Sequence, residues 1–150
     1  MIKVDVFLQN DTWKKYISNP KKYLNNKLKI IDNTSNFFKK QKFKFSILLG
    51  GDKEIKKLNK KFRKKNKSTD VLSFPFYNIK EFKKQKKGII YLGDVILNFN
   101  KINKKDFKND FDRLWVHGFL HLMGYKHFTN KDYKKMNKME ISILKKIRKN

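Results

Sequence analysis

The chain has 150 residues, and we expect residues 1–150 to form a single domain with one hydrophobic core. It contains no cysteine, which excludes disulfide bonds and thiolate ligands, so a metal must be bound through nitrogen or oxygen atoms. The formal net charge of +26 at pH 7 favours a polyanionic partner such as a nucleic acid.

Hydrophobic spacing predicts the elements of the first third of the chain. Ile2–Leu8 alternates apolar and polar residues, which indicates a strand with one buried face. Asn19-Pro20 is typical of a helix start, and the helical spacing that follows is interrupted over 33–36. Phe43–Leu49 predicts a second strand.

A short helix and two further strands are expected next. Asp52 is predicted to cap a helix that ends at Arg63. Its inward-facing residues are expected to be Ile55, Leu58, Asn59 and Phe62. The strand predicted over 70–76 contains Pro75, which cannot donate a ladder hydrogen bond, so this strand is expected at a sheet edge or to be irregular at Pro75.

The remaining elements are a loop, a strand and two helices. The polar stretch 77–87 predicts a surface loop, and 89–97 predicts a strand. Helical periodicity predicts one helix over 105–123 and a last helix over 131–147, followed by fraying of the basic tail 145–150. The inward face of the last helix is expected to comprise Tyr133, Met136, Met139, Ile143 and Ile147, with Glu140 among them.

All three histidines of the chain fall within eleven residues, as His117, His121 and His127. Four residues make about one helical turn, so the first two project from one helix face. Gly124 suits the left-handed residue that ends a helix and would turn the chain so that His127 approaches the pair. Three imidazoles without a thiolate predict an open metal site in which water completes the coordination. Core packing, the better interpretation of one isolated histidine, explains this trio less well.

An open zinc site can support hydrolysis, because Zn²⁺ lowers the pKa of a bound water from about 15.7 to about 7 and so supplies hydroxide. The zincin peptidase motif has a glutamate directly after its first histidine, where this chain has Gly118, which disfavours peptide hydrolysis by that route. Gly118 either admits a neighbouring element or the substrate, or serves simple helix packing. The sequence leaves both interpretations open.

The run from His117 to His127 resembles the signature H-G-x-L-H-L-x-G-Y-D-H of the YbeY family, the bacterial ribosomal RNA maturation endoribonucleases. The run Thr69-Asp70-Val71-Leu72-Ser73-Phe74-Pro75 is similar to the T-D-V-L-S-F-P segment of that family, and Leu92-Gly93-Asp94 is similar to its L-G-D strand. Met136, Met139, Glu140 and Ile143 fit its closing helix. The resemblance extends from the second strand onward.

The resemblance implies an α+β, zincin-like fold, in which a small mixed sheet packs with helices and the metal site lies at the end of the histidine-bearing helix. It implies single-strand-specific, metal-dependent cleavage of RNA, in 3′-end maturation of the small-subunit (16S) ribosomal RNA and in ribosome quality control. The expected ligands of one Zn²⁺ are His117, His121 and His127. The expected partners are single-stranded or ribosomal RNA, the small ribosomal subunit and its assembly factors.

Arg63 matches the functionally important arginine of the family. A guanidinium suits a phosphodiester better than an ammonium does, and this chain keeps arginine there among eight lysines between Lys53 and Lys67. The alternative is a surface salt bridge. The lysine excess itself has two explanations, selection for RNA binding or drift in an A/T-rich genome on solvated faces.

The remaining catalytic groups are left open by the sequence. Asp70 and Asp94 occur in otherwise apolar strands, where each is either a base, an orienting partner of a histidine or a structural hydrogen-bond acceptor. Glu140 either supports a ligand histidine or pairs with a basic residue. Lys126 occupies the position of the signature aspartate and reverses the charge beside His127.

Two other functions compete with the nuclease. One is a non-catalytic ribosome-assembly factor with a structural zinc, and the other is a zinc hydrolase acting on a small molecule or peptide. Because the start of the chain has no basic leader and no apolar run reaches the roughly 20 residues that span a bilayer, we expect a cytoplasmic location and no membrane partner.

Overall fold

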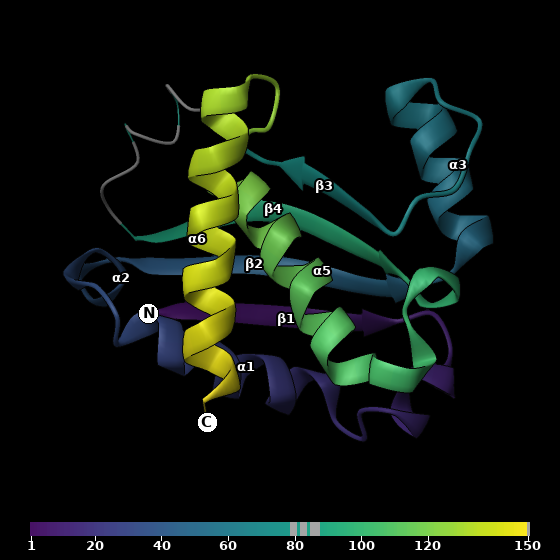
Figure 1. Cartoon of the computed structure of the whole chain (residues 1–150), viewed down its shortest axis with the longest axis horizontal. Coiled ribbons are helices and arrows are strands. Elements are labelled where there is room, and N and C mark those ends of the chain that lie inside the picture. Colours follow the sequence, from purple (N-terminus) through teal and green to yellow (C-terminus); the bar gives the residue numbers. More distant parts are fainter. Residues whose placement is uncertain (79–80, 82–83, 85–87, 150) are drawn as a thin grey trace.

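The computed structural model describes residues 1–78, 81, 84 and 88–149 (Figure 1). Its elements, in chain order, are β1 (Ile2–Leu8), the 3₁₀ turn η1 (Asp11–Lys15), α1 (Pro20–Asp32), α2 (Asn36–Lys40), β2 (Lys42–Gly50), α3 (Asp52–Arg63), β3 (Val71–Pro75), β4 (Ile89–Asn98), the 3₁₀ turns η2 (Phe99–Lys101) and η3 (Lys104–Asp106), α5 (Phe107–Leu122) and α6 (Asn130–Arg148). The loop predicted over 77–87 lies largely outside the described residues.

The four strands form one mixed sheet in the order β1-β2-β4-β3. The pairs β1·β2 and β2·β4 are parallel, whereas β3 runs antiparallel to β4. Of the two alternatives for the strand with Pro75, the edge position is confirmed, since among the described strands β3 pairs with β4 alone, and Pro75 is its last residue. The α+β class with a small mixed sheet and helices is also confirmed.

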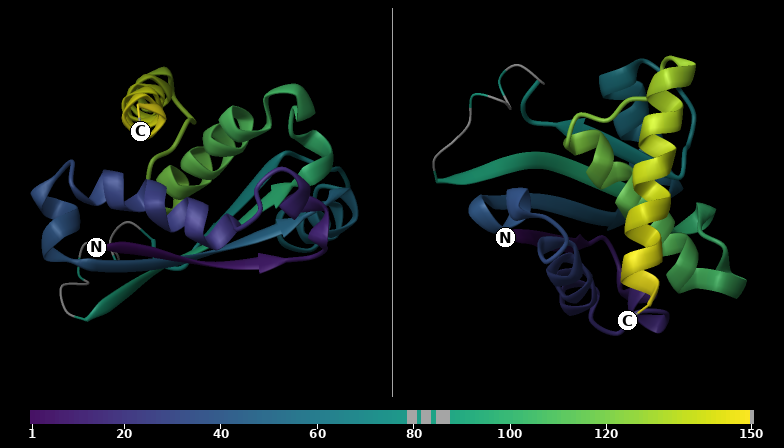
Figure 2. Two further views of the ribbon diagram at one scale, coloured as in Figure 1. Left: turned by 90° about the horizontal axis from the view of Figure 1, so that it is seen from below. Right: turned by 60° about the vertical axis from the view of Figure 1, so that its left-hand side comes forward.

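Three helices cover one face of the sheet. Figure 1 shows α5 and α6 in front of the strands and α1 alongside β1, and the left view in Figure 2 shows all three helices on one side of the sheet. The core between the layers includes Phe45, Ile47 and Leu97 of the sheet and Trp115 and Phe119 of α5, each fully buried. Burial of this apolar surface is the main stabilising contribution to the fold.

The first long helix starts where the sequence predicts. The side chain of Asn19 accepts a hydrogen bond from the amide of Lys22, and Pro20 occupies the first helical position. The predicted interruption over 33–36 is the break between α1 and α2. Phe43–Leu49 is paired as expected, within the slightly longer β2.

On the opposite face of the sheet α3 packs against β3 and β4 through a smaller cluster that includes Ile55, Leu72 and Ile96. Two predictions for this helix are wrong. Its N-cap is Gly51, and Asp52 instead accepts hydrogen bonds from Ser68 (2.7 Å) and Asn98 (2.6 Å).

The second wrong prediction concerns Phe62, which was expected to face inward and is 58% exposed. The side chains of Ile55 and Asn59 are buried as predicted. Phe62 contacts the Phe74 ring of β3 at one side only, because α3 covers only part of the sheet, and the rest of the Phe62 ring is left exposed.

The C-terminal helix also differs from the sequence prediction. Residues 145–148 continue α6 instead of fraying, because Ile147 is fully buried and its carbonyl accepts a hydrogen bond from Lys27 Nζ (2.8 Å). Tyr133 and Met139 are exposed at 59% and 37%, whereas Met136 and Ile143 are buried as expected. Within the described part of the chain, no helix combines the length and apolarity that crossing a membrane requires.

Candidate metal centre

The three histidines lie at the C-terminal end of α5 and in the turn that follows. Gly124 has a φ of 99°. Its amide donates to the carbonyl of His121 (3.0 Å), and the amide of Tyr125 donates to that of Leu120 (3.0 Å), the hydrogen-bond pattern of a Schellman motif. The turn predicted at Gly124 is therefore present, and it directs the chain so that His127 lies beside the other two.

The imidazoles converge on one point. One ligand atom from each of His117, His121 and His127 lies within 4.8 Å of the others, and these residues form the one potential metal-binding group found among the described residues. The Nε2 atoms of His117 and His121 are 3.1 Å apart. The ring centroid of His127 lies 4.8 Å from that of His121 and 5.7 Å from that of His117.

The other ring nitrogen of two histidines is held by an acceptor. Nδ1 of His117 hydrogen-bonds the carboxylate of Glu140 in α6. Nδ1 of His121 donates to the carbonyl of Tyr125 (2.9 Å). A carbonyl or carboxylate oxygen accepts a hydrogen bond from Nδ1, so Nε2 is the nitrogen that each neutral ring offers to a metal. Such partners typically orient histidines that ligate metals.

The pKa of His121 also suits a ligand. Burial, followed by the neighbouring His117, lowers the pKa of His121 to about 4, so this ring is neutral at pH 7. Two nitrogens bound to one tetrahedral Zn²⁺ at about 2.0–2.1 Å lie about 3.3 Å apart. The observed 3.1 Å between the Nε2 atoms of His117 and His121 is close to this value. The residues present therefore fit a zinc-type cation.

Gly118 packs α5 onto the sheet. A Cβ atom at this position would lie 2.6 Å from Cγ1 of Val95 and 3.2 Å from Oγ of Ser73. The hydroxyl of Ser73 donates to the carbonyl of Gly118 (3.2 Å). Of the two interpretations left open for Gly118, the structure supports the close approach of a neighbouring element, which is the sheet.

Arg63 lies at the open edge of the sheet. Its Nη2 donates to the carbonyl of Ser73 in β3 (3.0 Å), and its Cζ lies 5.9 Å from the centroid of the Phe74 ring. Ser73, whose carbonyl accepts this hydrogen bond, also donates through its hydroxyl to the carbonyl of Gly118, the residue after His117. One residue of β3 therefore links Arg63 to α5 beside His117, and the guanidinium hydrogen-bonds a carbonyl, not a carboxylate.

The structure does not bring the two candidate aspartates to the histidines. Asp70 pairs with Arg113 at 3.7 Å. Asp94 accepts a hydrogen bond from the Tyr91 hydroxyl (2.5 Å) and is exposed, on the sheet face opposite α5. For both, the structural interpretation is the one supported, and Glu140 is the carboxylate that contacts a histidine.

Two contributors to the centre were missed at the level of sequence. The carbonyl of Tyr125 orients His121, but every residue has a carbonyl, so only the Schellman geometry after Gly124 could have indicated it. Ser73 links β3 to α5 through the carbonyl of Gly118. Successive side chains of a strand point to opposite faces, so the place of Ser73 beside Phe74 could have indicated that the two side chains face opposite sides of the sheet.

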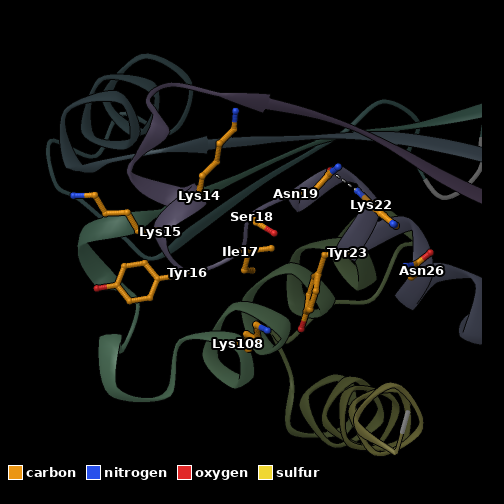
Figure 3. A pocket seen from close by; sticks show the side chains of 10 residues that line it. All are labelled: Lys14, Lys15, Tyr16, Ile17, Ser18, Asn19, Lys22, Tyr23, Asn26 and Lys108. Carbon is orange, nitrogen blue, oxygen red and sulfur yellow. Dashed lines mark hydrogen bonds between the residues drawn. The ribbon is translucent and has the colours of Figure 1, made fainter.

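A separate basic cavity of about 380 Å³ lies at the other end of α5 (Figure 3). Four lysines, Lys14, Lys15, Lys22 and Lys108, are among the residues that line it. Lys108 is in the first turn of α5, whereas His121 is in its last turn, so the two sites are separated by about 20 Å of helix. This cavity is therefore no part of the metal centre.

The mixed sheet, the helix layer and the three convergent imidazoles define a zincin-like α+β protein with a candidate metal centre. Comparison with known sequences identifies the family. The YbeY family model, described as Endoribonuclease YbeY, matches residues 7–148, and the chain belongs to this family.

Curated relatives agree with this assignment. The Endoribonuclease YbeY of Pelagibacter ubique is 44% identical over 151 residues, covering 97% of this chain and 95% of the relative. That of Bartonella henselae is 31% identical over 155 residues, covering 98% and 94%. The solution structure of TM1509 from Thermotoga maritima is similar in fold, with a TM-score of 0.55 and 23% identity over 98% of this chain and 89% of that one.

Proposed function

We propose that residues 1–150 act as one single-strand-specific, metal-dependent endoribonuclease domain. The observation that carries the proposal is the 3.1 Å approach of two Nε2 atoms whose Nδ1 atoms are both held by acceptors, in a chain whose relatives are named Endoribonuclease YbeY. The acceptors at the two Nδ1 atoms leave both Nε2 atoms of the neutral rings free to bind one cation between them.

His117, His121 and His127 would hold one Zn²⁺. When bound, this ion would supply an activated water and polarise a phosphoryl oxygen. Glu140 and the Tyr125 carbonyl keep the Nε2 atoms directed at the ion. No thiolate competes for the ion, since the chain has no cysteine. Neutral imidazole ligands do not neutralise the charge of the cation, which can therefore attract an anionic substrate.

Arg63 is proposed as the catalytic residue that binds the phosphodiester. Its guanidinium can donate bidentately to phosphate oxygens and stabilise the charge that develops in the transition state. Its present acceptor, the Ser73 carbonyl, fixes one side of the fork beside the histidines. Among the contacts that the described residues make at the centre, none supplies the group that protonates the leaving oxygen.

The charge of the chain supports an RNA substrate. With a formal charge of +26, the protein attracts phosphate polymers, and binding should weaken steeply as salt rises. The four lysines of the cavity in Figure 3 offer further phosphate contacts away from the histidines. We place the activity in maturation of the small-subunit ribosomal RNA 3′ end and in ribosome quality control, in the cytoplasm, with the small subunit and its assembly factors as partners.

The test combines elemental analysis with an RNA cleavage assay. The purified chain should contain close to one zinc per molecule and should cleave single-stranded RNA, and a chelator should abolish cleavage. His121→Ala should lose both metal and cleavage. Metal content without cleavage of RNA or ribosomes would overturn the nuclease and would favour the assembly-factor alternative, in which Arg63→Ala changes RNA affinity alone.

A further inference from the structure

A groove on the sheet face opposite the helix layer lies beside α3. It has a volume of about 530 Å³, within the range of about 300–1,000 Å³ typical of ligand cavities. We name it the aromatic groove. Its apolar walls are Phe7, Leu48, Leu58, Phe62, Phe74 and Ile96. Phe7 and Phe62 are 57% and 58% exposed, so large aromatic surfaces are open to solvent.

The edge strand β3 joins the aromatic groove to the metal centre. The Phe74 ring forms a groove wall and lies 5.9 Å from Cζ of Arg63, which donates to the carbonyl of Ser73. On the other side of the same strand, the hydroxyl of Ser73 donates to the carbonyl of Gly118, next to His117. A single extended strand therefore separates the groove from the histidines, and Arg63 lies at its edge.

The polar groups of the groove favour a base over a phosphate. Asp94 lines the groove with Ser46, and its carboxylate would repel phosphate but can accept hydrogen bonds from base amino groups. The positively charged side chains lie at the rim instead: Lys61 Nζ is 5.3 Å from the Phe62 ring centroid, and Arg63 lies beyond Phe74. The arrangement matches the flat aromatic ring of a base, flanked by a charged backbone.

We propose that the aromatic groove binds an unpaired nucleobase of single-stranded RNA while the backbone crosses β3 past Arg63 to the histidines. The proposal rests on the proposed nuclease function and adds a determinant of strand specificity. Phe62 and Phe74 pack edge to face, with ring centroids 5.5 Å apart, and Phe62 remains 58% exposed, so its ring offers surface on which a base can stack. Bases in a duplex are already stacked and cannot enter, so the groove favours single strands.

The test measures RNA affinity of the full chain by fluorescence anisotropy, with a chelator present so that no cleavage occurs. Phe62→Ala should weaken binding of a short single-stranded RNA at least about fivefold, because one base stacked on an aromatic side chain contributes on this scale. Phe62→Tyr, which keeps the ring, should bind as the wild type does. Duplex RNA should bind Phe62→Ala and wild type equally, since phosphate contacts are unchanged.

The matched control is Phe37→Ala, since Phe37 is 53% exposed and contacts Phe38 and Phe43, away from the groove. It should leave RNA affinity unchanged. Cross-linking of RNA that carries 4-thiouridine should map to residues of the aromatic groove in the wild-type chain, which tests the site without a mutation. Unchanged single-strand affinity in Phe62→Ala, equal weakening for duplex, or cross-links elsewhere would overturn the proposal and leave the groove to a protein partner.

A cleavage assay with metal separates this proposal from the nuclease itself. If the chain cleaves RNA but Phe62→Ala binds single strands normally, the base site is wrong and the nuclease stands. If Phe62→Ala loses single-strand affinity in a chain that never cleaves, the base site stands and the nuclease is wrong.

Discussion

Glu140 in α6 hydrogen-bonds Nδ1 of His117 in α5, so a residue of the last helix sets the orientation of a candidate metal ligand. Glu140→Gln removes the negative charge but keeps the shape. Because such partners typically change metal affinity by about 10- to 100-fold, we expect zinc affinity to fall at least about tenfold. A competition titration against a chromophoric chelator measures the change.

Glu54→Gln is the control for this variant, since Glu54 hydrogen-bonds the amide of Gly51 at the start of α3 and touches no histidine in the described structure. It should leave zinc affinity unchanged. Equal zinc affinities for Glu140→Gln and the wild type would show that the contact with His117 has no part in metal binding.

Arg63→Lys keeps the charge of the side chain but loses the planar fork. We expect the rate of RNA cleavage to fall by about 10²- to 10³-fold, as on removal of one donor to a transition state, while zinc content stays at the wild-type level. Single-turnover cleavage and elemental analysis check the two parts. Arg148→Lys, at the far end of α6 where Arg148 donates to the carbonyl of Asn109, should keep full activity. Loss of zinc in Arg63→Lys would mean a structural role.

Gly118→Ala should destabilise the fold. The new Cβ would lie 2.6 Å from Val95 Cγ1, so α5 must move from the sheet, at a cost of about 1–3 kcal/mol in the free energy of unfolding. Urea denaturation measures it. In Gly50→Ala the new Cβ meets no atom closer than 3.6 Å, and a much smaller change is expected. Equal stabilities for the two variants would contradict the close packing of α5.

Tyr23→Phe tests a buried carboxylate that lies apart from the metal centre. Both carboxylate oxygens of Asp112 accept from the Tyr23 hydroxyl (3.1 and 3.0 Å), and Oδ1 also accepts from Trp115 Nε1 (2.9 Å). Loss of one donor to a buried group should lower the free energy of unfolding by about 1–3 kcal/mol at pH 7. Tyr133→Phe, at a position that is 59% exposed, is the control and should change little.

The same variant has a defined pH dependence. Burial raises the pKa of Asp112 above 3.8, against the hydrogen bonds from Trp115 and Tyr23, which lower it. When the pKa of a group is higher in the folded than in the unfolded state, the free energy of unfolding falls as the pH rises from the unfolded-state pKa to the folded-state pKa. Removal of the Tyr23 hydroxyl raises the pKa of Asp112 further, so the deficit of Tyr23→Phe in the free energy of unfolding should shrink as the pH falls below 3.8 and Asp112 takes up a proton in both chains. A constant deficit would exclude Asp112 as its cause.

The elements and the histidine cluster were predictable because each depends on local spacing. His117 and His121 lie one helical turn apart, and Gly124 has the positive φ that its position implied. Glu140 was among the residues expected on an apolar face, and the structure gives it a histidine as partner. These features follow from the period of one helix and from the turn that ends it.

Other features depend on which surfaces meet, and local spacing does not encode that. Phe62 follows the apolar stripe of α3, but its exposure follows from the small area of sheet that α3 covers. Asp94 was a candidate for the centre because it interrupts an apolar strand, yet it faces the side of the sheet away from α5. The proximity of Arg63 to the histidines was implied by the resemblance alone, since it requires two helices on opposite faces to meet at one sheet edge.

The anchoring of α6 has a consequence for variants at the C-terminus. Ile147 is fully buried, and its carbonyl accepts from Lys27 of α1, so the end of the last helix fixes how the whole helix lies on its neighbours. Glu140 is about two turns upstream on that helix. Deleting the final turn would loosen the position of the Glu140 carboxylate, which orients His117. Truncation at the C-terminus should therefore lower the affinity of the centre for its metal ion.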